Sequence, residues 1–341
     1  MSRARTATRP DEPLLSVRDL SVRFGLRGQE SFAAVDEVSF DINPGQHLAI
    51  VGESGSGKSV TALAVMGLLP SRGVQVSGEV LYRGTDLLTC DRRAMSRLRG
   101  SEIAMVFQDP MTSLNPVVTI GRQVAEVVQR HLKVSRSEAF ERGVDLLTRV
   151  GIPDAGRRMK EYPHQLSGGM RQRVLIAIGL ACEPKLLIAD EPTTALDVTI
   201  QAQVLEVLRE LVADTDAALL MITHDLGVVA GLCDDVRVMY SGRIVESADR
   251  DRLFAEPRHP YTGGLLRSIP RLDSPRGQRL TPIPGSPTQT IPWEQGCAFA
   301  PRCAHRTDQC TDSAPPLEQS EGRALRCFHP LTGAASQQEA P

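Results

Sequence analysis

Aromatic residues are scarce in this chain of 341 residues, and neither positive nor negative charge is in large excess. Aromatic side chains make up 4% of the sequence, with a single tryptophan, and the formal net charge is −2. A net charge so near zero excludes the global basic field with which many proteins bind nucleic acid. The hydrophobic content of 41% is still enough for a sizeable core. The composition therefore favours a globular protein with one large domain and an appendage, or two smaller domains.

Long apolar runs are missing as well. Residues 1–12 contain no apolar stretch of the kind that marks a secretory signal, and apolar segments such as 61–69 and 174–182 are too short to cross a membrane. We therefore expect a soluble, cytoplasmic protein. In that compartment the seven cysteines are not expected to form disulfides, so clustered cysteines indicate a metal site.

A glycine-rich segment is the clearest functional motif. It comprises Gly52, Glu53, Ser54, Gly55, Ser56, Gly57, Lys58 and Ser59, followed by Val60. Its glycines let backbone N–H groups close around phosphates, while Lys58 can reach the β- and γ-phosphate oxygens and the Ser59 hydroxyl can bind Mg²⁺. The motif follows an expected strand and precedes an expected helix, which is the order that a phosphate loop requires. The sequence therefore predicts a nucleotide site here.

Short apolar runs predict an α/β fold with a parallel core. Strands are expected at 15–18, 35–42, 47–51, 186–189, 218–222 and 236–239, with helices at 60–69, 121–131, 137–150, 170–180 and 200–213. One strand ends in Asp190 and Glu191, which places both carboxylates at the sheet edge where α/β proteins bind ligands. Asp190 can then hold Mg²⁺ together with Ser59, and Glu191 can polarise the water that attacks the γ-phosphate.

Together with further motifs, these segments resemble in type and order the ATP-binding subunits of ABC transporters, over residues 14–250. The resemblance assigns Lys58 and Ser59 to Walker A, Gln108 to the Q-loop, Ser167, Gly168 and Gly169 to the signature, Asp190 and Glu191 to Walker B, Asp197 to the D-loop and His224 to the switch histidine. It implies a P-loop NTPase (RecA-like) core with an inserted helical subdomain and an antiparallel β edge. The expected limits are a disordered tail at 1–12, an ATPase domain at 13–250 with its helical subdomain at about 89–165, a C-terminal extension at 251–330 and a disordered tail at 331–341.

The resemblance also implies how these residues act. Gln108 can contact Mg²⁺ or the attacking water and so couple loss of the γ-phosphate to movement of the helical insertion. In the family, two subunits close head to tail around two ATP molecules, so the signature at the start of a helix would bind the γ-phosphate held by the opposite subunit. His224 can hydrogen-bond the γ-phosphate and hold Glu191 and water in place. Phe24 aligns with the aromatic residue that stacks on adenine, and Phe32 is its rival.

Four of the seven cysteines, Cys297, Cys303, Cys310 and Cys327, fall close together in a proline-rich segment. So few apolar residues surround them that we expect a bound metal to stabilise the segment, and four thiolates suit either an iron–sulfur cluster or zinc. The segments 259–262 and 297–303 resemble the C-terminal extension of oligopeptide and dipeptide importer ATPases, several of which carry a [4Fe–4S] cluster. Residues 170–173 resemble their D-type subunit. This resemblance favours a [4Fe–4S] cluster, with zinc as the alternative.

The resemblance therefore implies an ATP-hydrolysing subunit that powers a peptide importer, bound to the cytoplasmic face of the cell membrane. It implies two membrane-spanning permease subunits, a second ATPase subunit and, indirectly, an extracytoplasmic solute-binding protein as partners, and no nucleic acid. An importer of nickel or another small solute stays open. A soluble ABC ATPase that acts on nucleic acid or ribosomes would usually show two cassettes, long coiled-coil insertions or basic arms. A regulatory binder without catalysis would need a damaged Walker B or switch position, whereas Glu191 and His224 are both present.

Overall fold

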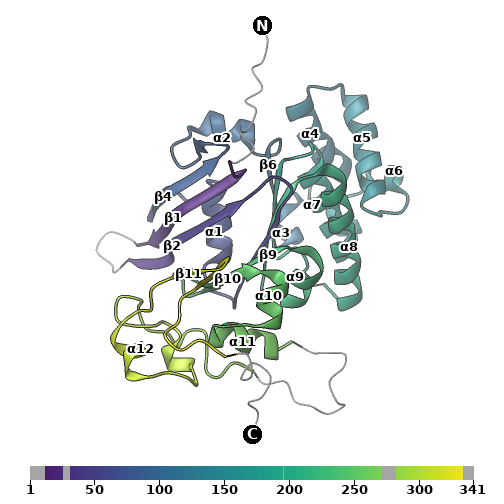
Figure 1. Ribbon diagram of the computed structural model, residues 1–341. Helices are drawn as coiled ribbons and strands as arrows, with labels where there is room; N and C mark the ends of the chain where they lie inside the picture. Colours follow the sequence, from purple (N-terminus) through teal and green to yellow (C-terminus); the bar gives the residue numbers. More distant parts are fainter. Residues whose placement is uncertain (1–11, 26–30, 195, 270–281, 333–341) are drawn as a thin grey trace.

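The computed structural model describes residues 12–25, 31–194, 196–269 and 282–332, so the tails expected to be disordered lie almost entirely outside the described residues. Its strands form two sheets (Figure 1). The smaller sheet is antiparallel, with the order β2-β1-β4-β5. Its strands are β1 (Leu15–Phe24), β2 (Phe32–Ile42), β4 (Val74–Tyr82) and β5 (Thr85–Asp86).

The larger sheet has eight strands in the order β11-β12-β10-β9-β3-β8-β7-β6. They are β3 (His47–Val51), β6 (Ile103–Val106), β7 (Leu186–Asp190), β8 (Ala218–Thr223), β9 (Asp235–Tyr240), β10 (Arg243–Asp249), β11 (Glu318–Ser320) and β12 (Arg323–Leu325). The strands from β9 to β6 run parallel, whereas β10, β12 and β11 pair antiparallel. The mixed sheet confirms the expected α/β core with an antiparallel edge.

Both faces of the larger sheet are buried. Along β3, Leu48 and Ile50 point to one face, and Ala49 and Val51 to the other, as the alternation of a strand requires. The first face packs on helix α1 (Lys58–Val65) and, through it, on the antiparallel sheet. The second face packs on α7 (Gly168–Leu180), α8 (Val198–Thr215), α9 (Leu226–Leu232) and α10 (Arg250–Ala255). The result is a layered molecule with α1 between the two sheets (Figure 1).

The region expected to be a helical insertion holds helices and also a strand. The helices are α2 (Arg92–Leu98), α3 (Pro110–Ser113), α4 (Ile120–Leu132), α5 (Arg136–Arg149), α6 (Ala155–Arg158) and a 3₁₀ turn at Pro163–Gln165. The prediction missed β6, which pairs with β7 at the end of the larger sheet. Four apolar residues are too few to show a strand period, so β6 is visible only from its pairing. The predicted lengths of two elements were also wrong, because β1 continues to Phe24 and α1 ends at Val65. Strand β4 was not predicted.

The C-terminal extension is more regular than its proline content suggested. It contains α11 (Pro260–Arg267), a 3₁₀ turn at Ala300–Arg302, α12 (Asp308–Asp312), and the strands β11 and β12, which lengthen the larger sheet beside β10. Trp293, Ala298 and Phe299 are buried in the same cluster as Val51 of the sheet. The extension thus shares a core with the ATPase fold at one end of the molecule (Figure 1), and the exact domain limits stay a prediction.

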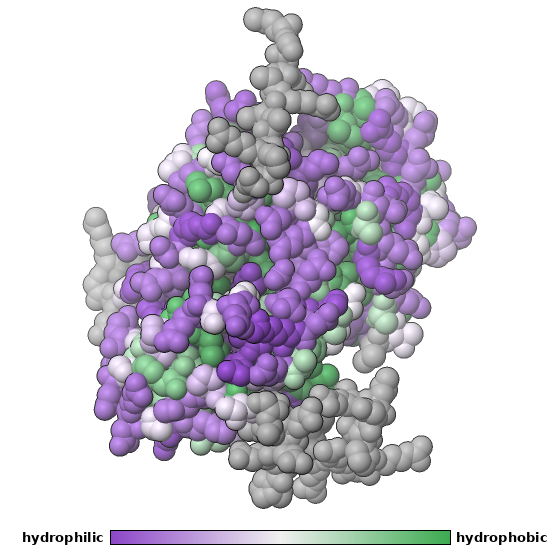
Figure 2. Space-filling model, viewed as in Figure 1, coloured by the Kyte–Doolittle hydropathy of each residue, from purple (hydrophilic) through white to green (hydrophobic). Residues whose placement is uncertain are grey.

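One face of the molecule is mainly polar. Figure 2 shows a face that is largely hydrophilic, with hydrophobic residues scattered over it. Among the helices in the described ranges, none combines the length and the apolar character needed to span a bilayer.

Candidate nucleotide site and cysteine cavity

The glycine-rich loop leaves the carboxyl end of β3 and enters α1 at Lys58. Two of its glycines lie against other backbone: a Cβ on Gly52 would stand 2.2 Å from the Met239 carbonyl oxygen, and one on Gly57 would stand 2.3 Å from that of Ala34. Gly57 also has a φ of 104°, in the left-handed region. The ends of β9 and β2 therefore fix the path of the loop, and only glycine fits at these two positions.

Positive charge and hydrogen-bond donors gather inside this loop. The Lys58 ammonium donates to the carbonyl oxygens of Gly52 at 2.8 Å and Glu53 at 2.9 Å. Burial lowers the pKa of Lys58, against the opposing effect of the carboxylates of Glu191, Asp190 and Glu53. The Ser56 hydroxyl is buried without a protein partner. An ammonium, an unsatisfied hydroxyl and the amino end of α1 fit a phosphate chain.

The carboxyl end of β7 lies directly beside the loop. Ser59 Oγ donates to Asp190 Oδ1 at 2.8 Å, as expected for two ligands of one Mg²⁺. Burial raises the pKa of Asp190, although the Ser59 hydrogen bond opposes the shift. Hydroxyl and carboxylate oxygens are the ligands that Mg²⁺ prefers, so this pair fits the ion.

Three side chains converge on one oxygen of Glu191. Its Oε2 accepts from Thr194 Oγ1 at 2.8 Å and from Gln108 Nε2 at 3.0 Å, and lies 3.4 Å from His224 Nδ1. The hydrogen bond to His224 lowers the pKa of Glu191 and raises that of His224. Glu191 also has a φ of 45°, which is rare for a residue other than glycine and is typical of functional sites.

Sheet order explains why residues so far apart in sequence meet here. β6, β7 and β8 are parallel neighbours, and Gln108, Glu191 and His224 each follow one of them at its carboxyl end. β3, which leads into the phosphate loop, is the next neighbour of β8. The sequence did not predict that Thr194 contacts Glu191. The position of Thr194, three residues after Glu191, is the signal that could have indicated this contact.

The remaining predicted nucleotide residues lie apart from this cluster. Ser167 caps α7, where its hydroxyl accepts from the Met170 N–H at 3.4 Å, and with Gly168 it is exposed, while Gly169 is half-buried. Asp197, before α8, is exposed too and makes no side-chain cap. Among the described residues, no hydrogen bond or ion pair joins this group to the phosphate loop.

The two aromatic candidates for adenine stacking face each other across the antiparallel sheet. Phe24 of β1 and Phe32 of β2 are direct strand partners. Phe24 is half-buried against the core, whereas Phe32 is 66% exposed. Both positions lie at the same end of the sheet, so the choice between them stays a prediction.

All four cysteines of the extension line one cavity. Cys297, Cys303, Cys310 and Cys327 surround it together with three histidines, His259, His305 and His329. All four thiols are free, and burial raises the pKa of Cys297 to about 11 and that of Cys327 to about 12. As placed, no set of three or more histidine, cysteine or acidic side chains in the described ranges is arranged to hold a metal ion.

The fully buried His259 adds a ring nitrogen without a well-formed hydrogen bond to this cavity. Its Nδ1 accepts from the Tyr261 N–H at 3.0 Å, while its Nε2 is buried and makes no hydrogen bond of ordinary geometry, although the backbone of Arg326 interacts with the ring. Burial lowers the pKa of His259 to about 3, so the ring is neutral and its Nε2 carries the proton. A buried N–H donor beside four thiols fits the surroundings of a sulfur-ligated metal group.

Comparison with known proteins agrees with this arrangement. The family described as "ABC transporter" matches residues 35–194. The oligopeptide transport ATP-binding protein OppD of Salmonella typhimurium (strain LT2) is 50% identical over 335 residues, which cover 97% of this chain and 99% of that protein. This chain belongs to the ATP-binding subunits of ABC transporters. ATP hydrolysis is the activity of this enzyme family, and the phosphate loop and acidic edge described above have the groups for it.

Further similarities concern the extension and the fold of this ABC ATPase. The family described as "Oligopeptide/dipeptide transporter, C-terminal region" matches residues 245–310. The dipeptide transport ATP-binding protein DppD of Bacillus subtilis (strain 168) is 49% identical over 319 residues, covering 93% of this chain and 95% of that protein. A solved dimeric structure of the ATP-binding cassette MJ0796 bound to ADP and Pi is similar with a TM-score of 0.62 and 26% identity. The match covers 69% of this chain and 98% of that one.

Proposed function

We infer that this ABC ATPase hydrolyses ATP to power a peptide importer. The observation that carries the inference is the convergence of Gln108, Thr194 and His224 on Glu191, beside the Ser59–Asp190 pair. The peptide substrate is supported by relatives of about half identity that are named oligopeptide and dipeptide transport proteins, and by the matching C-terminal region.

Each residue of the cluster has a role in this proposal. Lys58 and the amino end of α1 bind the β- and γ-phosphates, with Gly52 to Gly57 wrapped around them. Ser59 and Asp190 would hold Mg²⁺, which neutralises the charge that builds up on the phosphates. Glu191 accepts the proton of the attacking water, and Gln108 and His224 hold the carboxylate and water in position. Such hydrolysis depends mainly on positioning and on charge stabilisation.

A second ATPase subunit would complete the site. Ser167, Gly168 and Gly169 lie at the exposed start of α7, a 13-residue helix whose N–H groups suit a phosphate. α7 packs on the opposite face of the sheet from α1, so within one chain this phosphate site is separate from the phosphate loop. Head-to-tail closure of two subunits, with Asp197 and an adenine-stacking Phe24 at the interface, would join the two half-sites. The dimer of the similar cassette supports this arrangement.

The partners follow from transport. Two permease subunits would bind this ATPase at the cytoplasmic face of the membrane, where it would be peripheral. An extracytoplasmic solute-binding protein would act on the same assembly from the other side, and no nucleic acid is involved.

For the extension, we propose that Cys297, Cys303, Cys310 and Cys327 hold an iron–sulfur cluster. Support comes from four free thiols around one cavity and from the Nε2 of His259, which is buried beside them without a well-formed hydrogen bond. Burial raises the pKa of the Cys297, Cys303 and Cys327 thiols, so ligation by them must release protons. Anaerobically purified protein should be brown and should contain iron and sulfide. A colourless protein with zinc would reject the cluster in favour of zinc.

The decisive experiment for the function is transport by the whole assembly. The chain should co-purify with two hydrophobic permease subunits, and vesicles containing this complex and its binding protein should accumulate labelled oligopeptide only when ATP is supplied. Accumulation of nickel instead of peptide would show that the transported substrate is not a peptide. ATP turnover stimulated by nucleic acid, without permease binding, would replace the importer by a soluble ATPase.

A further inference from the structure

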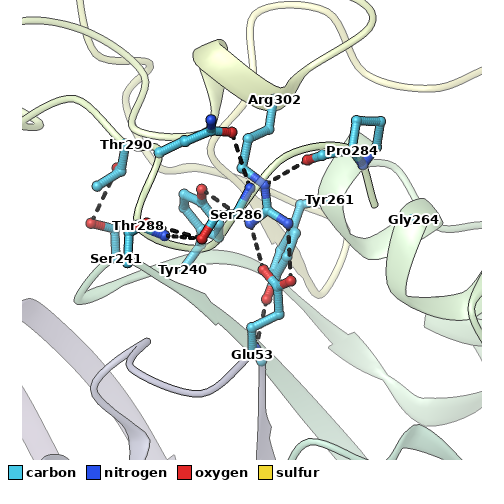
Figure 3. Close-up of polar contacts among 12 residues, drawn as sticks. Glu53, Tyr240, Ser241, Tyr261, Gly264, Pro284, Ser286, Thr288, Thr290 and Arg302 are labelled. Carbon is cyan, nitrogen blue, oxygen red and sulfur yellow. Dashed lines mark hydrogen bonds and ion pairs between the residues drawn. The ribbon is translucent and has the colours of Figure 1, made fainter. Parts of the chain in front are cut away.

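The C-terminal extension contacts the phosphate loop directly. Both terminal nitrogens of Arg302 donate to the carboxylate of Glu53, one at 2.6 Å and the other at 3.0 Å, across 249 residues of sequence. Figure 3 shows the guanidinium of Arg302 directed at this carboxylate. Glu53 is the second residue of the glycine-rich loop, so the extension reaches the part of the enzyme that cradles phosphate.

The position of Arg302 is fixed on every side. Its side chain is 1% exposed, its Nε donates to the Pro284 carbonyl at 2.9 Å, and its guanidinium lies 5.9 Å from the ring centres of both Tyr240 and Phe299. A buried arginine held by a carboxylate, a carbonyl and two rings has one orientation. Arg302 therefore supports Glu53 rigidly, unlike an arginine in an ion pair on the protein surface.

A second contact from the extension holds the backbone of the same residue. The Glu53 N–H donates to the hydroxyl of Tyr261 at 2.7 Å. Tyr261 lies in α11, is fully buried, and packs against Tyr240 with ring centres 4.7 Å apart. Both the backbone and the side chain of Glu53 are therefore held by residues beyond position 251.

Charge gives the ion pair a further consequence. The Glu53 carbonyl accepts from the Lys58 ammonium, so its carboxylate lies near the lysine that binds phosphates. An unpaired carboxylate there would repel the triphosphate and compete for Lys58. Arg302 balances this charge from the side of the extension.

We propose that Arg302 and Tyr261 are positioning residues through which the C-terminal extension holds the phosphate loop in its ATP-binding form. Arg302 ends the 3₁₀ turn between Cys297 and Cys303, so the fold of the cysteine segment is transmitted to the loop. This inference rests on the proposed ATPase function. It makes nucleotide affinity, more than the hydrolytic step, depend on the extension.

The test is equilibrium binding of MgATP, followed with a fluorescent analogue, together with KM and kcat. Arg302→Met should raise the Kd and the KM for ATP about tenfold with little change in kcat, because loop geometry and charge serve binding. Arg302→Lys keeps the charge but loses the paired hydrogen bonds, and Tyr261→Phe loses only a hydroxyl, so each should raise the Kd about threefold.

A rescue variant distinguishes a loss of charge balance at Glu53 from a general loss of structure in the phosphate loop. Adding Glu53→Gln to Arg302→Met removes the unpaired carboxylate and should return the Kd to within about threefold of the wild type. The matched control is Arg323→Met. Arg323 is another buried arginine of the extension, which donates to the carbonyls of Arg252 and Glu256 and lies 3.7 Å from the carboxylate of the buried Glu246. Among the contacts of the described residues none joins Arg323 to the phosphate loop, so this substitution should leave the Kd within about twofold.

The outcomes distinguish this inference from the proposed function. If Arg302→Met fails to fold, the milder Arg302→Lys and Tyr261→Phe variants decide. Wild-type affinity in both, or an equal loss of affinity in Arg323→Met, would overturn the positioning role. Failure of the wild-type chain itself to bind MgATP would instead contradict the ATPase function.

Discussion

The nucleotide edge and the cysteine cavity are built in different ways. At the nucleotide edge, residues at or beyond the carboxyl ends of four parallel strands meet in direct contacts of 2.8 to 3.4 Å around Asp190 and Glu191. Around the cavity, three of the cysteines come from loops, two of them on either side of a 3₁₀ turn, and one comes from the five-residue α12, and they share a cavity without forming a compact ligand set.

The difference shows what holds each site in shape. Parallel strands bring their carboxyl ends to one edge through backbone hydrogen bonds, so the arrangement of the proposed catalytic residues follows from the sheet itself. The regular elements of the cysteine segment are only three to five residues long, so we expect the arrangement of its thiols to depend on side-chain packing and on ligation. We therefore expect the first site to be preorganised and the second to be completed by the metal group that we propose for it.

The largest effect is expected at the preorganised edge, from Glu191→Gln. The amide cannot accept the proton of the attacking water, so kcat for ATP hydrolysis should fall about 100-fold or more while MgATP still binds. Steady-state turnover and equilibrium binding measure the two quantities. Glu206→Gln is the control, since Glu206 is a half-exposed acid on α8 whose ion pair is with Arg209. Undiminished turnover in Glu191→Gln would show that another group acts as the base.

The next effect tests whether the cysteine site is completed by a ligand. Replacing Cys303 by serine should reduce bound iron from about four atoms per chain to below about one and abolish the visible absorption, because a cluster of this kind needs all its thiolates. Cys182→Ser is matched to it, since Cys182 is also half-buried but lies outside the cavity. Equal iron content in the two variants would contradict ligation by Cys303.

Most of what could be predicted from the sequence came from short motifs. Lys58, Asp190 and Glu191 each stand beside a recognisable strand, so their meeting at one edge follows from local pattern and sheet geometry. Strand β6 was missed because its four residues show no period, although it is the element that carries Gln108 to the site. The motif therefore indicated the residue without showing the strand that positions it.

Long-range contacts were beyond the reach of the sequence. The Glu53–Arg302 pair depends on how the extension folds back on the ATPase core, and no local pattern specifies a contact between positions so distant. Cysteine spacing likewise suggested a shared site, and the four thiols do line one cavity, but the metal itself stays a prediction.

A third prediction concerns the backbone of the phosphate loop. Gly57→Ala should destabilise the protein by about 3 kcal/mol, because the new Cβ would strike the Ala34 carbonyl in a left-handed conformation. Gly55→Ala is the matched comparison, with a φ of 82° but open space around it, and should cost about 1 kcal/mol. Unfolding in denaturant measures both. Equal costs would mean that the loop adapts and is not fixed by its neighbouring strands.

The smallest expected effect is a shift in the pKa of His224 at the nucleotide edge. The hydrogen bond with Glu191 raises the pKa of His224 above its ordinary 6.5, so this ring should stay protonated at a pH where free histidine is neutral. NMR titration of the histidine ring protons measures the shift, and Glu191→Gln should return the pKa towards 6.5. A His224 pKa that is unchanged by this substitution would show that the two side chains do not interact in solution.

The same pair also contributes to stability in a defined pH window. His224 has a raised folded pKa, so its contribution is complete below pH 6.5 and is lost as the pH rises through that folded pKa. Glu191 has a lowered folded pKa, so its contribution is present above its ordinary 4.5 and is lost as the pH falls through the folded value. The pair should therefore stabilise the fold most between about pH 4.5 and 6.5. Because His224 is 57% exposed, solvent screens the pair and the gain in the free energy of unfolding should be small.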